Sequence, residues 1–353
     1  MGWIKSTVAA ALMAGTAPLP TTLITPANLD AIVQPHVADK SFMGQVLVAK
    51  GDTILFDRFY GYANVEWNVA FAPDTRFRIG SMTKQFTAAA VMKLVADKKV
   101  ALDATVSTYV TDLPATWSKV TVQQLLDQTA GLPDYTSDPR FSAVSRQPTK
   151  PGELIALVAD KSPEFAAGSK WRYSNTNYLV LGKLIEDVSG KPYAVFLRET
   201  LFAPLGMKGT AFDSVNRIMP HRADGYRNEA NALSNANYMD ESVPFSAGGL
   251  VATGRDLLTW ERALFGGRIL SPQDSKLMTE PVKDEYAFGL WNHVRDGIHQ
   301  IEHGGNINGF NSEMAYYPES DVTVIVLSNV EGVSAKLISE EIYHKLIPKR
   351  SSH

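Results

Sequence analysis

The sequence of 353 residues contains no cysteine, which excludes disulfide bonds, thiolate metal sites, cysteine nucleophiles and lipid-modified cysteines. It also lacks an excess of charge of either sign, since 34 Lys and Arg face 37 Asp and Glu for a net charge of -3. A nucleic-acid-binding protein normally carries a basic excess that neutralises phosphates, so we expect no nucleic-acid partner. With 45% hydrophobic and 20% charged residues and no low-complexity tract or repeat, the sequence is that of a folded globular protein.

Long hydrophobic runs are missing too, and the N-terminal segment comes closest to one. Residues 6–14 (STVAAALMA) are apolar, follow one positive charge and precede the small residues 15–17. Pro18 and Pro20 interrupt this stretch before it reaches the roughly 20 residues that a membrane-spanning helix needs. The pattern predicts an export signal over residues 1–17 and a secreted or periplasmic protein without a stable membrane span. The alternative is a frayed extension of a cytoplasmic protein.

Strand-like segments lie near both ends of the sequence, with helix-like segments between them. GQVLVAK and TILFDRFYGY, within residues 44–62, flank a Gly-Asp turn and predict a hairpin. Short strand-like runs in meander order are found at 286–291, 298–303, 312–317 and 322–327. Apolar spacing predicts helices at 28–40, 81–96, 121–128, 175–188 and 334–346.

This order of elements predicts an α/β (α+β) fold. Strands from both ends would form one antiparallel sheet flanked by helices, with an all-helical lobe beside it. We expect one catalytic domain over residues 28–349. Within it, residues 28–102 and 271–349 would form the α/β lobe and residues 103–270 the mainly helical lobe. A cleft between the lobes is the expected place for a site.

The pattern Ser81-Met82-Thr83-Lys84 opens the most apolar of the predicted helices. Residues three apart share a helix face, so the Lys84 amine can reach the Ser81 hydroxyl. That hydroxyl becomes a strong nucleophile only when a neighbour removes its proton, and a lysine can do this only when burial keeps it largely neutral. The Ser81 backbone N–H at the helix start could face a developing oxyanion. S-x-x-K arises about once by chance in a chain this long, so its occurrence alone carries no weight. Its position at the start of the most apolar helix favours a catalytic pair over a helix cap with an exposed lysine.

Tyr173-Ser174-Asn175 is a second candidate element, directly before a predicted helix. A tyrosine hydroxyl near the lysine could relay a proton to the leaving group, and the Asn175 amide could bind a substrate carbonyl. The same Y-x-N pattern begins at Tyr62 and Tyr226, where a surface turn is the simpler interpretation.

His303-Gly304-Gly305 forms a third element, at the end of a predicted strand. Two glycines would let a substrate backbone approach closely, and the Asn306 N–H could be a second oxyanion donor. His303 could orient a substrate carboxylate or tune the Tyr173 hydroxyl, although a lone histidine is more often structural.

In order and spacing, these three elements resemble the serine β-lactamase and penicillin-binding superfamily. The likeness is strongest to the class C β-lactamase branch, which includes DD-carboxypeptidases, D-aminopeptidases and family VIII esterases. It runs over about residues 31–346 and includes VQQLLDQTAGLP at 122–133. The resemblance implies a two-lobed fold and an acyl-enzyme on Ser81, with no metal and no cofactor. It also implies a small acyl substrate, such as a D-amino-acid peptide, an ester or a β-lactam, and a cleft lined by Tyr135 and Phe245.

Two positions depart from this branch. Class C β-lactamases carry a lysine at the position of His303, and histidine is mostly neutral at pH 7, so we expect slow β-lactam turnover at best. Gln128 stands where a histidine is common, and we interpret it as structural. The sequence thus predicts a hydrolase of the DD-carboxypeptidase, D-amino-acid peptidase or esterase type. The alternative is a non-hydrolytic penicillin-binding or sensor module.

Overall fold

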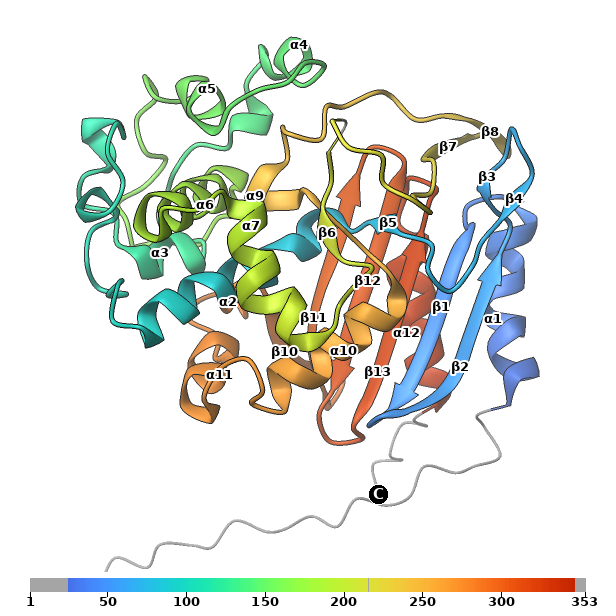
Figure 1. The fold of residues 1–353 in the computed structure, drawn as a ribbon. Coiled ribbons are helices and arrows are strands. Elements are labelled where there is room, and N and C mark those ends of the chain that lie inside the picture. The colour runs from blue at the N-terminus through green and yellow to red at the C-terminus, as the bar shows by residue number, and fades with distance from the viewer. Residues whose placement is uncertain (1–24, 215, 347–353) are drawn as a thin grey trace, which may run out of the picture.

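The computed structural model describes residues 25–214 and 216–346, and the export signal predicted at 1–17 lies outside them. Its central feature is a six-stranded sheet with strand order β10-β11-β12-β13-β1-β2 (Figure 1). Every neighbouring pair is antiparallel, and β1 from the N-terminal part lies next to β13 from the C-terminal part. The predicted sheet, built from both ends of the chain, is therefore confirmed.

The strands are β1 (Gly44–Lys50), β2 (Thr53–Tyr60), β3 (Tyr62–Asn64), β4 (Val69–Ala70), β5 (Phe77–Arg78), β6 (Ala211–Phe212), β7 (Tyr226–Glu229), β8 (Ala232–Asn235), β9 (Leu250–Ala252), β10 (Trp291–Arg295), β11 (Ile298–Ile307), β12 (Phe310–Tyr317) and β13 (Val322–Ser328). The α-helices are α1 (Pro26–Ala38), α2 (Thr83–Ala96), α3 (Val122–Leu126), α4 (Phe141–Val144), α5 (Pro151–Ala156), α6 (Asn175–Ser189), α7 (Tyr193–Leu197), α8 (Ala203–Leu205), α9 (Phe245–Gly248), α10 (Gly254–Phe265), α11 (Pro272–Thr279) and α12 (Ser334–Leu346). The remaining helical turns are η1 (Gly80–Met82), η2 (Val106–Thr108), η3 (Ala115–Trp117), η4 (Tyr135–Ser137) and η5 (Arg198–Phe202).

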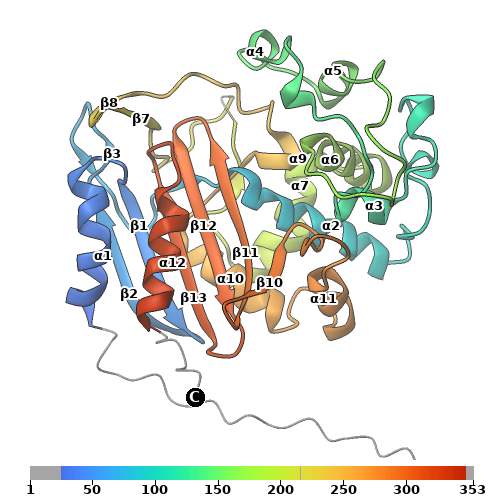
Figure 2. The same cartoon turned by 180° about the vertical axis from the view of Figure 1, so that it is seen from behind.

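Both faces of the sheet are covered by helices, because side chains along each strand alternate between two cores. On β1, Val46 and Val48 belong to the core shared with α1 and α12, whereas Leu47 and Ala49 belong to the core shared with α2 and α10. Figure 2 shows α1 and α12 side by side on the first of these faces. No helix within 25–214 and 216–346 is long and apolar enough to span a membrane.

The C-terminal strands differ from the prediction at two places. Residues 286–290 form a turn rather than a strand, and β10 begins only at Trp291, since Gly289 has a φ of +73° and the Ala287 N–H donates to the Leu290 carbonyl. β11 continues to Ile307, so the His-Gly-Gly element lies within a strand and not at its end.

A helical body, with α6 at its centre, lies beside the sheet (Figure 1). α2 connects the two parts, and all of its residues from Thr83 to Met92 are buried, as the apolar sequence predicts. One helix lies elsewhere than expected: α10 falls in the range 103–270 predicted for the helical lobe, yet it covers the sheet. Its Gly254 N–H donates to Gln45 on β1, which fixes the start of the helix against that strand.

Candidate active site

Ser81 lies in η1, directly before α2, and its side chain is half-buried. The Nζ atom of Lys84 is 3.1 Å from its Oγ atom, so the pair predicted from the spacing does form a hydrogen bond. Gly80 adopts a left-handed φ of +51°, and a Cβ atom there would lie 3.0 Å from the backbone N of Asn306. The start of α2 is therefore pressed against β11, and this close approach requires a glycine.

Lys84 is 0% exposed, and its amine has two further partners. Nζ lies 2.8 Å from Oδ1 of Asn175 and 2.8 Å from the carbonyl oxygen of Ala247. Burial lowers the pKa of Lys84 to about 7, while the negative charge of Asp134 acts in the opposite direction. A neutral amine has two N–H donors, which these two acceptors occupy, so its lone pair is left to accept the Ser81 proton.

Asn175 and Asp134 form a chain behind the lysine. Nδ2 of Asn175 donates to Oδ2 of Asp134 at 3.1 Å, so the amide lies between the amine and a carboxylate. The sequence predicted that Asn175 binds a substrate carbonyl, whereas its amide here contacts Lys84 and Asp134. The sequence analysis missed Asp134, which also caps η4 by accepting from the Thr136 N–H at 3.0 Å. An aspartate after Gly131-Leu-Pro is a recognisable capping signal, but nothing local reveals its charge near a distant lysine.

Tyr173 lies beside the same amine. The Lys84 Nζ atom is 4.7 Å from the centroid of its ring. Burial raises the pKa of Tyr173, and a hydrogen bond with Ser81 offsets only part of this effect. The hydroxyl therefore holds its proton at neutral pH, as a proton donor must.

His303 completes the group from β11, with its ring centroid 6.4 Å from that of Tyr173. Its Nδ1 is 2.6 Å from the Gly304 carbonyl oxygen and therefore carries the proton, so Nε2 can accept from the Tyr286 hydroxyl at 3.3 Å. Burial, with the nearby Lys84, lowers the pKa of His303 to about 4. The imidazole is neutral at pH 7 and offers no fixed positive charge to a substrate carboxylate.

The two glycines after His303 have a different role from the expected one. A Cβ atom on Gly305 would lie 1.9 Å from the Ile79 carbonyl oxygen, and one on Gly304 would lie 2.7 Å from Oε2 of Glu313. Their missing side chains thus make room for the chain's own segments rather than for a substrate backbone. Gly305 in particular lets β11 lie against the residues before Ser81.

Tyr135 and Phe245, the two predicted cleft residues, are packed in the interior. Tyr135 is buried, and its hydroxyl donates to the Val243 carbonyl at 3.1 Å. The Phe245 ring lies 5.0 Å from that of Tyr193 and 6.0 Å from that of Phe212. Both side chains are therefore buried, which differs from the predicted place on the surface of a cleft.

The contacts of Gln128 are all with the chain itself, as expected for a structural residue. Its Oε1 atom accepts from the Ser174 N–H at 3.0 Å and from Nδ2 of Asn177 at 2.6 Å. Its own carbonyl accepts from the Arg172 N–H at 3.0 Å. The residue thereby holds the loop that carries Tyr173.

Known proteins resemble this chain over most of its length. Protein flp of Staphylococcus aureus (strain MW2) is 25% identical over 341 residues, which are 91% of this chain and 66% of the relative. The chain thus spans just under two thirds of the length of that protein. Among solved structures, a penicillin binding protein from Bacillus halodurans matches with a TM-score of 0.79 and 25% identity, covering 89% of this chain and 98% of the other. The D-amino acid amidase from Ochrobactrum anthropi SV3, complexed with D-phenylalanine, matches with a TM-score of 0.77 and 27% identity. The match covers 90% of this chain and 96% of the amidase.

The matching family model is described as Beta-lactamase and covers residues 29–346, nearly all of the described chain. This match shows that the protein belongs to the β-lactamase family.

Proposed function

We propose that the chain hydrolyses small acyl substrates through an acyl-enzyme on Ser81, as an amidase or peptidase for D-amino-acid derivatives. The observation that carries the proposal is the buried Lys84 amine 3.1 Å from the Ser81 hydroxyl, with a pKa of about 7. A base whose pKa lies near the working pH is partly neutral and still basic enough to take the proton.

In the first step, Lys84 takes the proton of the Ser81 hydroxyl while Oγ attacks the substrate carbonyl. The backbone N–H groups of Ser81 and Asn306 stabilise the oxyanion that forms. As the tetrahedral intermediate collapses, the Tyr173 hydroxyl gives its proton to the leaving group and regains one from Lys84. Water then attacks the acyl-enzyme by the same steps in reverse, which releases the acid and restores Ser81.

The neutral His303 favours amide and ester substrates over those that carry a carboxylate next to the scissile bond. A carboxylate would gain no ion pair from an imidazole whose pKa is about 4. We therefore expect slow β-lactam turnover, and we place D-amino-acid amides above peptides that end in a free carboxylate. The D-amino acid amidase among the similar structures supports this order. Activated short esters should also react, because an alkoxide leaves with less help than an amine.

A fluorophosphonate probe, a fluorescent penicillin and a substrate panel together test the proposal. We expect fluorophosphonate labelling, fluorescent penicillin that is released during a chase, and a higher kcat/KM for D-amino-acid amides than for D-Ala-D-Ala peptides or nitrocefin. Fluorescent penicillin that persists through the chase, together with no turnover of any substrate in the panel, would indicate a penicillin-binding sensor module instead. A protein that neither probe labels would contradict an acyl-enzyme on Ser81.

A further inference from the structure

A pocket of 450 Å³ lies beside β5, which leads into η1, and beside the turn between β11 and β12. Its lining is mostly polar and includes the side chains of four asparagines, two arginines and three acidic residues. Such a lining suits a hydrogen-bonding group better than an alkyl chain, since burying these groups against hydrocarbon would leave them unpaired.

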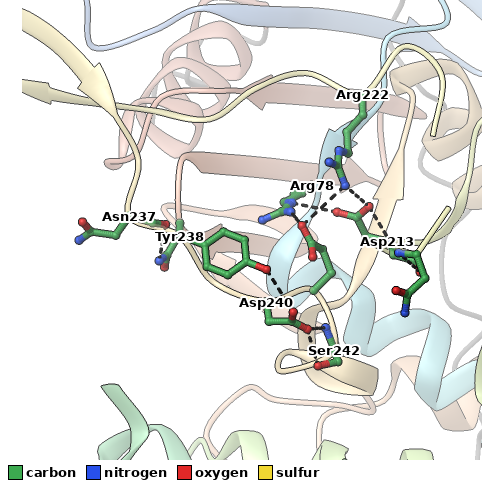
Figure 3. A network of polar contacts seen from close by, with 11 residues as sticks. Arg78, Asp213, Arg222, Asn237, Tyr238, Asp240 and Ser242 are labelled. Atoms are coloured by element: carbon green, nitrogen blue, oxygen red, sulfur yellow. Dashed lines mark hydrogen bonds and ion pairs between the residues drawn. The ribbon is translucent and has the colours of Figure 1, made fainter. Parts of the chain in front are cut away.

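The two arginines of this pocket are already paired. Arg78 donates to Oδ2 of Asp213 at 2.9 Å and also to Oε1 of Glu241. Arg222 lies 2.8 Å from Oδ1 of Asp213 and 3.6 Å from Oε1 of Glu241. Figure 3 shows both guanidinium groups turned toward Asp213. The charge of each arginine is therefore already balanced by a carboxylate, which makes the pocket less suited to an anionic ligand.

One buried side-chain atom at the pocket has no hydrogen-bond partner among the described residues, and it is an acceptor. Oε2 of Glu241 has no hydrogen-bond partner among the residues that the structure describes, and Glu241 is only 4% exposed. The lining carboxylates Glu66, Asp224 and Glu241 outnumber Arg78 and Arg222 by one, which leaves a net negative charge. A buried carboxylate oxygen without a donor is costly, so a ligand that brings a donor or a positive charge is favoured.

Two aromatic side chains on the rim fit the same ligand. Trp67, in the turn between β3 and β4, is 81% exposed, and Tyr238 is 55% exposed. Aromatic faces attract cations, with tryptophan the strongest of them.

The pocket lies near the reacting centre. Arg78 precedes Ser81 by three residues, and the lining residue Asn308 follows Asn306 by two. Because consecutive Cα atoms are about 3.8 Å apart, Asn308 lies within about 8 Å of Asn306, whose N–H is the expected oxyanion donor. We propose that the pocket receives the acyl part of the substrate and binds, through Glu241, a protonated amine about two residue lengths (about 7 Å) from the scissile carbonyl. This inference rests on the proposed acyl-enzyme at Ser81.

Three p-nitrophenyl esters with the same leaving group test the inference: 6-aminohexanoyl, heptanoyl and 5-carboxypentanoyl. They place an ammonium, a methyl or a carboxylate at the same distance from the carbonyl. We expect kcat/KM to be about tenfold higher for the ammonium ester than for the methyl ester, and lowest for the carboxylate ester. The preference for the ammonium should shrink as salt rises, because ions screen the attraction.

Two variants locate the preference within the pocket. Glu241→Gln should bring the ratio of ammonium to methyl ester close to one. Because that change also touches Arg78, Trp67→Ala provides a second probe at an exposed position and should lower the same ratio. Leu337→Ala, at an exposed position on α12 away from the pocket, is the control and should leave the ratio as in the wild type.

The outcomes separate the two proposals. Turnover of all three esters at similar rates, or fastest turnover of the carboxylate ester, would overturn the amine pocket and leave the acyl-enzyme in place. Absence of turnover, together with no fluorophosphonate labelling of Ser81, would overturn both. An ammonium preference that survives in both pocket variants would also contradict a role for Glu241.

Discussion

Replacing Asp134 with asparagine should move the pH dependence of the reaction to lower pH. The Asp134 carboxylate raises the pKa of Lys84, and burial lowers it to about 7. Without the negative charge, burial lowers the pKa of Lys84 further, so the amine becomes neutral at a lower pH. Since the neutral amine is the base, kcat/KM rises with pH through this pKa, and the rise should come earlier in the variant.

The size of the effect follows from the chain Lys84–Asn175–Asp134. Its two hydrogen bonds measure 2.8 and 3.1 Å. With the amide between them, the amine and the carboxylate are about 7 Å apart, which corresponds to about 2 kcal/mol at an effective dielectric of about 20. Asp134 is partly exposed, and solvent screens the pair, so we expect the midpoint to fall by about one pH unit, from about 7 to about 6.

The assay is kcat/KM for a p-nitrophenyl ester between pH 5 and 9. Asparagine is also a good helix cap, so the contact with the Thr136 N–H should survive and the fold should lose only about 1 kcal/mol. Asp52→Asn, in the exposed turn between β1 and β2, is the matched control and should keep a midpoint near 7. A midpoint that stays in place or rises in Asp134→Asn would refute the electrostatic account of Lys84.

Three further variants test other parts of the site and its support. Lys84→Met should lower kcat by about 10²–10⁴-fold with a much smaller change in KM, because the base acts mainly in the transition state; a raised KM with unchanged kcat would contradict that role. Gly305→Ala should cost about 1–3 kcal/mol in urea unfolding, because its Cβ would lie 1.9 Å from a carbonyl oxygen; Gly152→Ala, with open space around it, is the control, and equal stability of the two would disprove the packing argument. Burial and the charge of Glu302 raise the pKa of Glu313 well above its usual value, so the fold retains a proton that the unfolded chain loses above about pH 4.3. Stability should therefore fall as pH rises past that value, and Glu313→Gln should show a higher Tm than the wild type at pH 8 and the same Tm at pH 4; a lower Tm at pH 8 would show that the carboxyl is ionised in the fold.

Much of the fold could be predicted from the sequence because its signals are local. The hairpin of β1 and β2 follows from two strand-like runs around a Gly-Asp turn, and α2 follows from a long apolar run. The apolar residues of the turn at 286–290 predict a strand, because they give no sign that Gly289 adopts a left-handed φ. The placement of α10 depends on contacts with β1, which are far away in the sequence.

The candidate site divides in the same way. Ser81 and Lys84 are found from the spacing of one helical turn, and that spacing predicts their contact. The role of Asn175 as a partner of Lys84, and the presence of Asp134, depend on segments that are brought together only in the folded chain. The function of Gly305 is likewise set by the Ile79 carbonyl, which is distant in sequence.

The most direct test of the central claim is to map the covalent adduct formed with a fluorophosphonate by peptide mass spectrometry, at a series of pH values. A buried lysine that activates one serine predicts a single adduct on the peptide containing Ser81, formed at a rate that rises with pH around 7 and then levels off. It also predicts no adduct in Ser81→Ala. An adduct on another residue, or equal labelling of Ser81→Ala, would contradict the claim.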